Sequence, residues 1–232
     1  MKNQYVGDIN DYKKYSLIEI ISEVLNEKIL IAWMLTDGDS RNDGNKLDYL
    51  KNNRNERQLN PELFDKLISI DKSKREIKTV QELLGEKYNY YSETLCDNRE
   101  ERTKYFETLL VEAKEVGIVF FDPDNGIEVK SVKYGNKNSS KYLYWDEIQQ
   151  FTKSGKDILI YQHFPFFKKR EPYTNDLITE LQEKTKLEVL PIATEHVLFL
   201  LATKQGCKLN EIKKKWDERN EYPKEKQKIK KR

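Results

Sequence analysis

The chain has 232 residues, a length that suits one large domain or two small ones. With 35% charged residues, a mean hydropathy of -0.87 and no apolar run near the roughly 20 residues of a membrane helix, it is not expected to span a membrane. The 42 basic and 40 acidic residues give a net charge of +2, so the whole chain has no strong attraction to nucleic acid. The first residues (MKNQY) lack the apolar region of a signal peptide, and we expect a cytoplasmic protein.

Hydrophobic spacing predicts the elements of the first half of the chain. Tyr12–Leu25 has helical spacing behind Asp11, which we expect to cap that helix, and Lys28–Leu35 (KILIAWML) is the first predicted strand. The charge-rich region 54–86 is predicted to be helical, as an insertion or cap on the same domain. The other elements expected here are a short helix, Lys46–Asn52, a strand, Tyr88–Leu95, and a helix, Asn98–Lys114.

The second half is organised around Gly117–Glu128 (GIVFFDPDNGIE). Four apolar residues run into a Pro/Asn/Gly cluster there, which predicts a buried strand that ends in a tight loop. The polar stretch Lys130–Lys141 predicts a mobile loop. The elements expected after it are the helices Trp145–Thr152, Asn175–Thr185 and Leu209–Glu218 and the strands Asp157–Tyr161, Leu187–Ile192 and His196–Thr203.

Strands that alternate with helices predict a mainly parallel sheet with helices on both faces. The last two predicted strands are joined by a link short enough for a hairpin, so an antiparallel pair should close the sheet. We therefore expect one doubly wound α/β domain over residues 1–220, with the helical insertion at about 54–86. Residues 221–232, which include KEKQKIKKR, are expected to be a disordered basic tail, and a phosphate-binding arm is the alternative.

The principal candidate site is Asp122-Pro123-Asp124-Asn125-Gly126, at the end of the apolar run. Ligands of open α/β sheets bind beyond the carboxyl ends of the strands. Asp122 and Asp124 can ligate Mg²⁺ or Mn²⁺, which prefer hard oxygen ligands, and Asn125 can bind an amine or a base edge. The alternative is a turn that uses Pro and Asn-Gly only for its geometry.

A second acidic stretch, residues 37–44 (DGDSRNDG), follows the first predicted strand. Asp37, Asp39 and Asp43, with Gly44, can hold a cation or bind the ribose or amine of a nucleotide-type cofactor. The stretch lacks the spacing of the glycine loops that bind dinucleotides or phosphates, and a solvated acidic loop is the alternative. Asp8, beside Gly7, is a further candidate for cofactor binding.

His163 follows another buried strand, 157–161, and should reach the same edge of the sheet as Asp122. A histidine there can act as a general base or a metal ligand, and a hydrogen-bonded structural histidine is the alternative. The basic residues Lys168, Lys169 and Arg170 come shortly afterwards. They can meet phosphates or form a solvated loop.

Motifs from most of the chain occur together: Gly7-Asp8, Asp11-Tyr12, Tyr15, Leu17, Trp33, Asp37, Asp43-Gly44, Tyr49-Leu50, Phe121–Gly126 and Tyr161-Gln162-His163. This combination resembles a widespread uncharacterised bacterial family, which carries no established activity and so implies no catalytic residues. At a coarser level the chain resembles the Rossmann-like methyltransferases, whose fourth strand ends in an Asp/Asn-Pro-Pro-Tyr-type motif that orients an amine for methyl transfer. Asp122-Pro123-Asp124-Asn125 occupies the matching place without the second Pro and the aromatic residue, and residues 37–44 replace the glycine-rich loop.

Three hypotheses about function follow. In the first, the chain is an enzyme that acts on a nucleic acid or nucleotide: Asp37 and Asp43 contact S-adenosylmethionine, while Asp122, Asp124 and Asn125 hold the reacting group. In the second, it is a Mg²⁺- or Mn²⁺-dependent phosphodiesterase or nuclease, in which Asp43, Asp122 and Asp124 ligate the metal and His163 is a base or ligand. In the third, it is a non-enzymatic module whose degenerate site binds a ligand or partner.

Overall fold

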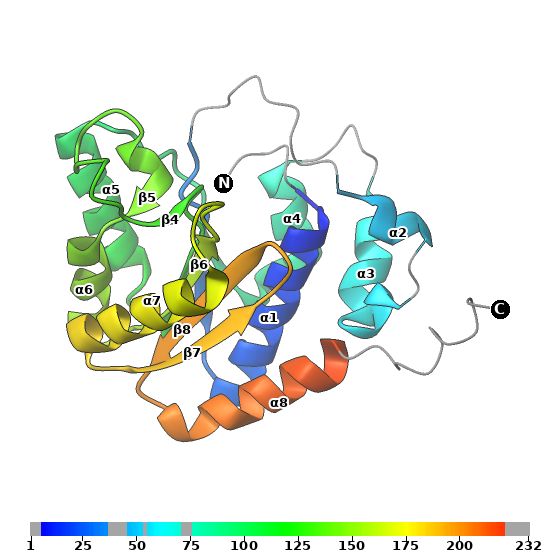
Figure 1. The fold of residues 1–232 in the computed structure, drawn as a ribbon. Coiled ribbons are helices and arrows are strands. Elements are labelled where there is room, and N and C mark those ends of the chain that lie inside the picture. The colour runs from blue at the N-terminus through cyan, green and yellow to red at the C-terminus, as the bar shows by residue number, and fades with distance from the viewer. Residues whose placement is uncertain (1–5, 37–45, 53–54, 71–75, 221–232) are drawn as a thin grey trace.

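A computed structural model describes residues 6–36, 46–52, 55–70 and 76–220 (Figure 1). Its centre is a six-stranded sheet in the order β2-β1-β3-β6-β8-β7. The strands are β1 (Ile29–Ala32), β2 (Asn89–Tyr91), β3 (Ile118–Phe121), β6 (Asp157–His163), β7 (Glu188–Ala193) and β8 (Val197–Thr203). The first four in the sheet order are parallel, and β8 is antiparallel to both of its neighbours.

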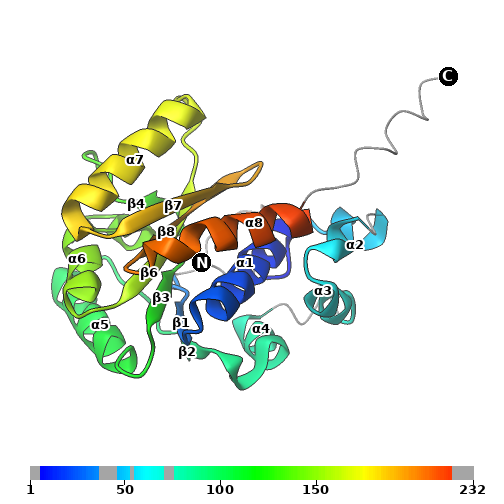
Figure 2. The same ribbon diagram turned by 90° about the horizontal axis from the view of Figure 1, so that it is seen from below.

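The helices that accompany the sheet are α1 (Ile9–Leu25), α2 (Asp48–Asn52), α3 (Pro61–Ile68), α4 (Ile77–Leu84), α5 (Arg99–Glu112), α6 (Trp145–Lys153), α7 (Arg170–Thr185) and α8 (Leu209–Asn220). Figures 1 and 2 show α5, α6 and α7 on one face of the sheet and α1 and α8 on the other, with α3 and α4 beside α1. The predicted α/β class, with a mainly parallel sheet covered on both faces, is confirmed. Among the described residues, no helix has the length and apolar character needed to cross a membrane.

Two hydrophobic cores fill the spaces between the sheet and its helices. Successive residues of a strand point to opposite faces, so each buried strand contributes to both cores. In β3, Ile118 and Phe120 pack on the α1 face, while Val119 and Phe121 pack on the α5 face. The sheet is therefore apolar on both sides, as parallel sheets with helices on both faces require.

Several element boundaries differ from the prediction. Helix α1 begins at Ile9 and its cap is Asp8, not Asp11, because the Asp8 carboxylate accepts the backbone N–H groups of Asn10 and Asp11. Helix α7 begins five residues before the predicted start, at Arg170. Strand β6 extends through His163 because that residue pairs with Val197 of β8.

The polar stretch 130–141 is flanked by a small parallel sheet of β4 (Gly126–Ile127) and β5 (Tyr142–Leu143), which the sequence did not predict. Most of the stretch is exposed or half-buried, but Ser139 and Ser140 near its end are buried. The buried Arg102 of α5 forms two hydrogen bonds with Glu147 of α6 and donates to the carbonyl oxygen of Ser139 at 3.0 Å. This arginine therefore fixes the loop to two helices.

Candidate active site at the carboxyl edge of the sheet

The strand order reverses between β1 and β3. From β1 the chain moves outward to β2 at the edge, and it returns to β3 on the other side of β1. In open α/β sheets such a switch point leaves a crevice beyond the carboxyl ends of the strands, where ligands bind. The loop that begins with Asp122 lies at this point. Its first backbone N–H donates to Ala32 of β1 at 3.1 Å, and Thr36 donates to the Asp124 carboxylate at 2.8 Å.

A buried lysine lies beneath that loop. The Lys14 ammonium donates to Asp11 and to Asp122, both at 2.7 Å, and all three side chains are almost fully buried. The same ammonium lies 5.0 Å from the ring centroid of Tyr161 and 5.5 Å from that of Tyr15, so aromatic faces also stabilise its charge. Because Asp122 follows Phe120 by two residues, strand alternation directs it to the α1 face.

The protonation of this cluster follows from its burial. Burial raises the pKa of Asp11 to about 7; Lys14 opposes this rise, and the neighbouring Asp8 adds to it. Burial raises the pKa of Asp8 as well. For Lys14 burial acts to lower the pKa, but Asp11 and Asp122 outweigh it, and the pKa is well above its ordinary value. Lys14 therefore stays protonated, and Asp11 exchanges its proton near neutral pH.

Asp8 and Gly7 form the turn that starts α1. Gly7 has a φ of +76°, which glycine adopts at no steric cost, and its N–H donates to Asp11 at 3.1 Å. Its carbonyl oxygen accepts the Tyr49 hydroxyl at 2.9 Å. Asp8 is buried, and its carboxylate caps the helix. The prediction that Asp8 binds a cofactor stays a prediction, while the structure gives this carboxylate a role in the fold.

His163 lies at the end of β6, on the same face of the sheet as Tyr161. The two rings meet edge to face with centroids 5.1 Å apart. The side chain of His163 is partly exposed to solvent. The surrounding protein still displaces enough water to lower the pKa of its imidazole, although Asp122 and Asp124 act to raise it. The imidazole is therefore mainly neutral at pH 7 and is able to accept a proton.

Gln162 connects the end of β6 to the loop after β3. Its side-chain oxygen accepts the Ile127 N–H at 2.8 Å, and its amide nitrogen donates to the Asn125 carbonyl at 3.2 Å. Gly126 has a φ of +110°, and a Cβ there would come within 2.3 Å of the Gln162 amide. Gly126, from the motif after β3, and Gln162, from the motif at the end of β6, are therefore in direct contact.

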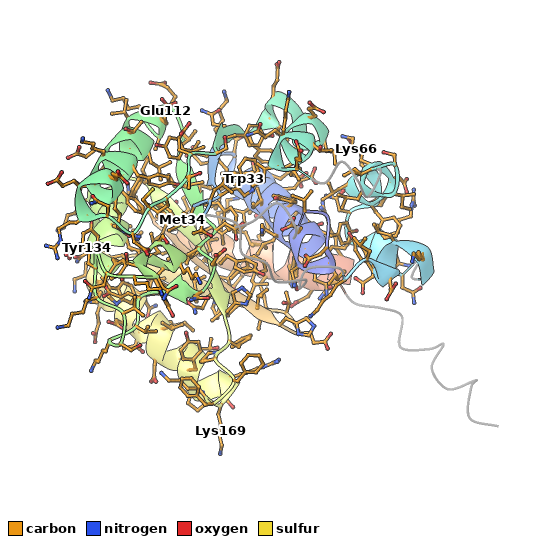
Figure 3. The ribbon with its side chains drawn as sticks, turned by 90° about the horizontal axis from the view of Figure 1, so that it is seen from above. Trp33, Met34, Lys66, Glu112, Tyr134 and Lys169 are labelled. Atoms are coloured by element: carbon orange, nitrogen blue, oxygen red, sulfur yellow. The ribbon has the colours of Figure 1, made fainter. Side chains whose placement is uncertain are left out.

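The end of β1 is also unusual. Met34 is fully buried and has a φ of +46°, a left-handed conformation that is costly for a residue with a side chain. Strained residues of this kind gather at functional sites. The preceding Trp33 donates to the Tyr15 hydroxyl at 3.1 Å and stacks on Tyr90 of β2 at 5.5 Å. Figure 3 shows Trp33 and Met34 near the middle of the molecule when it is viewed from above.

The predicted site residues divide into three groups. Asp122, Asp124, Asn125 and His163 follow or end neighbouring strands at one edge, with Asp124 and Asn125 half-buried there, and Asp8 lies below at the start of α1. Asp37, Asp39, Asp43 and Gly44 lie outside the described residues. Sequence reasoning missed the cluster of Asp11, Lys14 and Asp122, for which the spacing of Asp11 and Lys14 on one helix face was the only signal.

The described part of the chain contains no group of three His, Cys, Asp or Glu residues arranged to hold a metal ion. The metal site suggested from the sequence needed Asp43, which is not described. The chain matches no protein-family model, and no curated protein or solved structure is significantly similar to it. The resemblance to an uncharacterised bacterial family therefore stays a prediction from the sequence.

Proposed function

We propose that this chain is an enzyme that acts on a nucleic acid or nucleotide through a methyltransferase-like site at the carboxyl ends of β1, β3 and β6. One observation carries the proposal: the loop Asp122–Asn125 lies at the switch point of the sheet and is hydrogen-bonded to Ala32 at the end of β1 and to Thr36 beyond it. That is where ligands bind in open α/β sheets. It is also the place that the amine-orienting motif takes in Rossmann-like methyltransferases.

The closure of the sheet supports the same proposal. Strands β7 and β8 form an antiparallel pair beside β6, and such a closing pair is the pattern of methyltransferase folds. An antiparallel strand at this position distinguishes the sheet from one that is parallel throughout.

The charges of the site fit a cationic cofactor. Within the buried cluster, the Lys14 ammonium balances Asp122, and the raised pKa of Asp11 leaves that group partly protonated near neutral pH. Asp124 adds a half-buried carboxylate above it. Excess negative charge raises the local concentration of cations. S-adenosylmethionine, which is a sulfonium with an ammonium group, would supply a methyl group here.

The exposed and buried residues take different roles. Asp124 and Asn125, half-buried at the edge, offer oxygen acceptors to an amine of the substrate. An amine that gains a methyl group releases a proton, and the neutral His163 at the same edge accepts it. Lys14 holds Asp122 in place from below. The acceptors are thereby fixed before the substrate binds, which lowers the cost of ordering them.

The metal-dependent alternative has less support from the geometry. Lys14 lies 2.7 Å from an oxygen of Asp122, so a divalent cation on the same carboxylate would meet a positive charge nearby. A nuclease site that used Asp122 would have to displace this ammonium, and Lys14 is held by Asp11 as well.

Isothermal titration of the full chain with S-adenosylmethionine tests the proposal. Wild type is expected to bind saturably, and Asp37→Asn, which changes a residue expected from the sequence to contact the cofactor, is expected to bind at least tenfold more weakly. The matched control is Asp157→Asn, which removes a buried carboxylate at the end of β6 opposite to the candidate site. Saturable binding that is unaffected by Asp37→Asn, or no binding by folded wild type, would overturn the proposal. Titrations with Mg²⁺ and Mn²⁺ form the second arm of the experiment. Binding of these metals without binding of S-adenosylmethionine would favour the nuclease.

A further inference from the structure

The loop between β6 and α7, residues 164–169, carries two exposed aromatic side chains. Phe166 is 109% exposed and Phe167 is 86% exposed, whereas the next most exposed large apolar side chain among the described residues, Val111, is 55% exposed. Phenylalanine is among the residues most often buried in folded proteins. Two adjacent ones therefore indicate a surface that another molecule covers.

The loop holds these rings in a defined place. The Lys168 N–H donates to the Pro165 carbonyl at 3.3 Å, which closes a turn with Phe166 and Phe167 at its two central positions. Such corners usually carry Gly, Asn, Asp, Ser or Pro. The sequence places phenylalanine at both, where neither ring can reach the core.

The base of the loop is tied to the candidate site. Tyr173 accepts a hydrogen bond from Gln162 at 2.9 Å, and Phe164 packs on Tyr173 with centroids 6.5 Å apart. Arg170 lies 4.9 Å from the Phe164 ring, and Lys168 lies 5.1 Å from the Tyr173 ring. Since Gln162 also binds the loop after β3, both loops share one anchor.

Three consecutive cations accompany the rings. Lys168, Lys169 and Arg170 are all exposed, and Glu171 is the one acid beside them. Figure 3 shows Lys169 at the margin of the molecule, with its side chain directed away from it. The loop therefore has a local positive charge, although the whole chain is almost neutral at +2.

From this arrangement we propose that residues 164–170 bind single-stranded nucleic acid and present one of its bases to Asp124, Asn125 and His163. The inference rests on the proposed function, because the loop borders that site. Exposed aromatic rings stack on unpaired bases, and neighbouring cations meet the phosphates. A base whose amine is to react must leave its duplex stack.

The site favours a nucleic acid over a lipid surface. A base that passes the rings brings exocyclic amine donors to the carboxylate of Asp124 and the amide of Asn125, which supply acceptors. A membrane would instead bring anionic headgroups against the same carboxylates. Interfacial binding also uses a broad apolar helix face, and only two rings protrude here.

Fluorescence anisotropy with labelled 12-nucleotide strands of DNA and of RNA tests the proposal, with wild-type full-length protein at several salt concentrations. Each stacked base contributes about 5- to 150-fold in affinity, so Phe166→Ala/Phe167→Ala is expected to weaken binding at least tenfold. Lys168→Ala/Lys169→Ala should lower the slope of log K against log salt by about 1.4, which is about 0.7 for each lost phosphate contact. The matched controls are Val111→Ala, an exposed apolar residue, and Lys104→Ala, an exposed cation, both on α5.

Three outcomes would overturn the inference. In the first, the double phenylalanine variant binds the single strand with an affinity within twofold of that of wild type. In the second, the protein binds a duplex of the same length with equal affinity, and in the third it binds phosphatidylserine vesicles through the phenylalanines but binds neither nucleic acid. The DNA and RNA arms identify the source of the strand. Because the assay contains no cofactor, it separates the two proposals. Cofactor binding by a protein that ignores single strands refutes the loop inference alone, and the reverse result refutes the cofactor proposal alone.

Discussion

Replacing Asp11 by asparagine should change how the stability of the protein depends on pH. Burial raises the pKa of Asp11 from 3.8 to about 7 in the folded state, so the folded protein binds this proton more tightly than the unfolded chain does. Stability must then fall as the pH rises through this interval. A difference of about 3 pKa units, at about 1.36 kcal/mol each, corresponds to about 4 kcal/mol lost between pH 4 and pH 8.

Asp11→Asn removes that proton but keeps most of the shape. Its amide can accept from only one of the two groups that now donate to the carboxylate, Gly7 and Lys14, which costs about 1–3 kcal/mol at every pH. At pH 4.5 the variant should therefore be less stable than wild type. At pH 8 the difference should disappear or reverse, since Lys14 then faces Asp122 in a neutral pair.

Urea unfolding followed by tryptophan fluorescence, repeated from pH 4.5 to pH 8.5, gives the two stability curves. Other titrating groups, His163 among them, are present in both proteins, so their effects largely cancel in the difference. Two curves that run parallel over this range would mean that Asp11 does not change its protonation. Burial would then not raise the pKa of this carboxyl group into the range of the measurement.

Three further substitutions test the contacts around the site. Lys14→Met should lower the free energy of unfolding by about 3–5 kcal/mol at pH 7, because it leaves two buried carboxylates without their cation; a loss below 1 kcal/mol in urea titrations would contradict this. Gly126→Ala should lower the free energy of unfolding by about 1–3 kcal/mol more than Gly85→Ala. Both glycines have a positive φ, but only at Gly126 would the added Cβ clash with a neighbouring side chain, so equal midpoints of thermal unfolding would rule out the clash. Arg102→Leu should lower the free energy of unfolding by about 3–5 kcal/mol, since it leaves the buried Glu147 without its positive partner. It should also increase proteolysis between residues 130 and 141, and an unchanged cleavage pattern would show that the loop does not need this anchor.

The strands of the central sheet were predictable from sequence because their apolar runs are short, continuous and bounded by turn residues. Ile118–Phe121 begins and ends where it was expected, and the edge that carries Asp122 and His163 follows from parallel strands alone. The start of α1 was not predictable in the same way. Asp8 and Asp11 are both good capping residues, three positions apart, and only the hydrogen bonds show that Asp8 caps while Asp11 turns inward.

The partners of the buried charged residues could not be predicted from the sequence. Lys14 and Asp122 are separated by 108 positions, and Arg102 and Glu147 by 45, so no local pattern connects them. Periodicity gives the face on which a residue lies but not what it meets there. The same holds for the stretch 130–141, because Arg102, which donates to the carbonyl oxygen of Ser139, comes from another element. Its predicted mobility stays a prediction.

Side chains of β3 alternate between the two cores, and this alternation restricts which length changes the sequence can accept during evolution. Asp122 reaches Lys14 because it is an even number of residues from Phe120 and Ile118 on the α1 face. An insertion or deletion of one residue within β3 would exchange the two faces and turn the carboxylate toward α5. Lineages that keep the lysine cluster should therefore conserve the length of this strand. Length changes should gather in the surface connections, where they leave the parity intact.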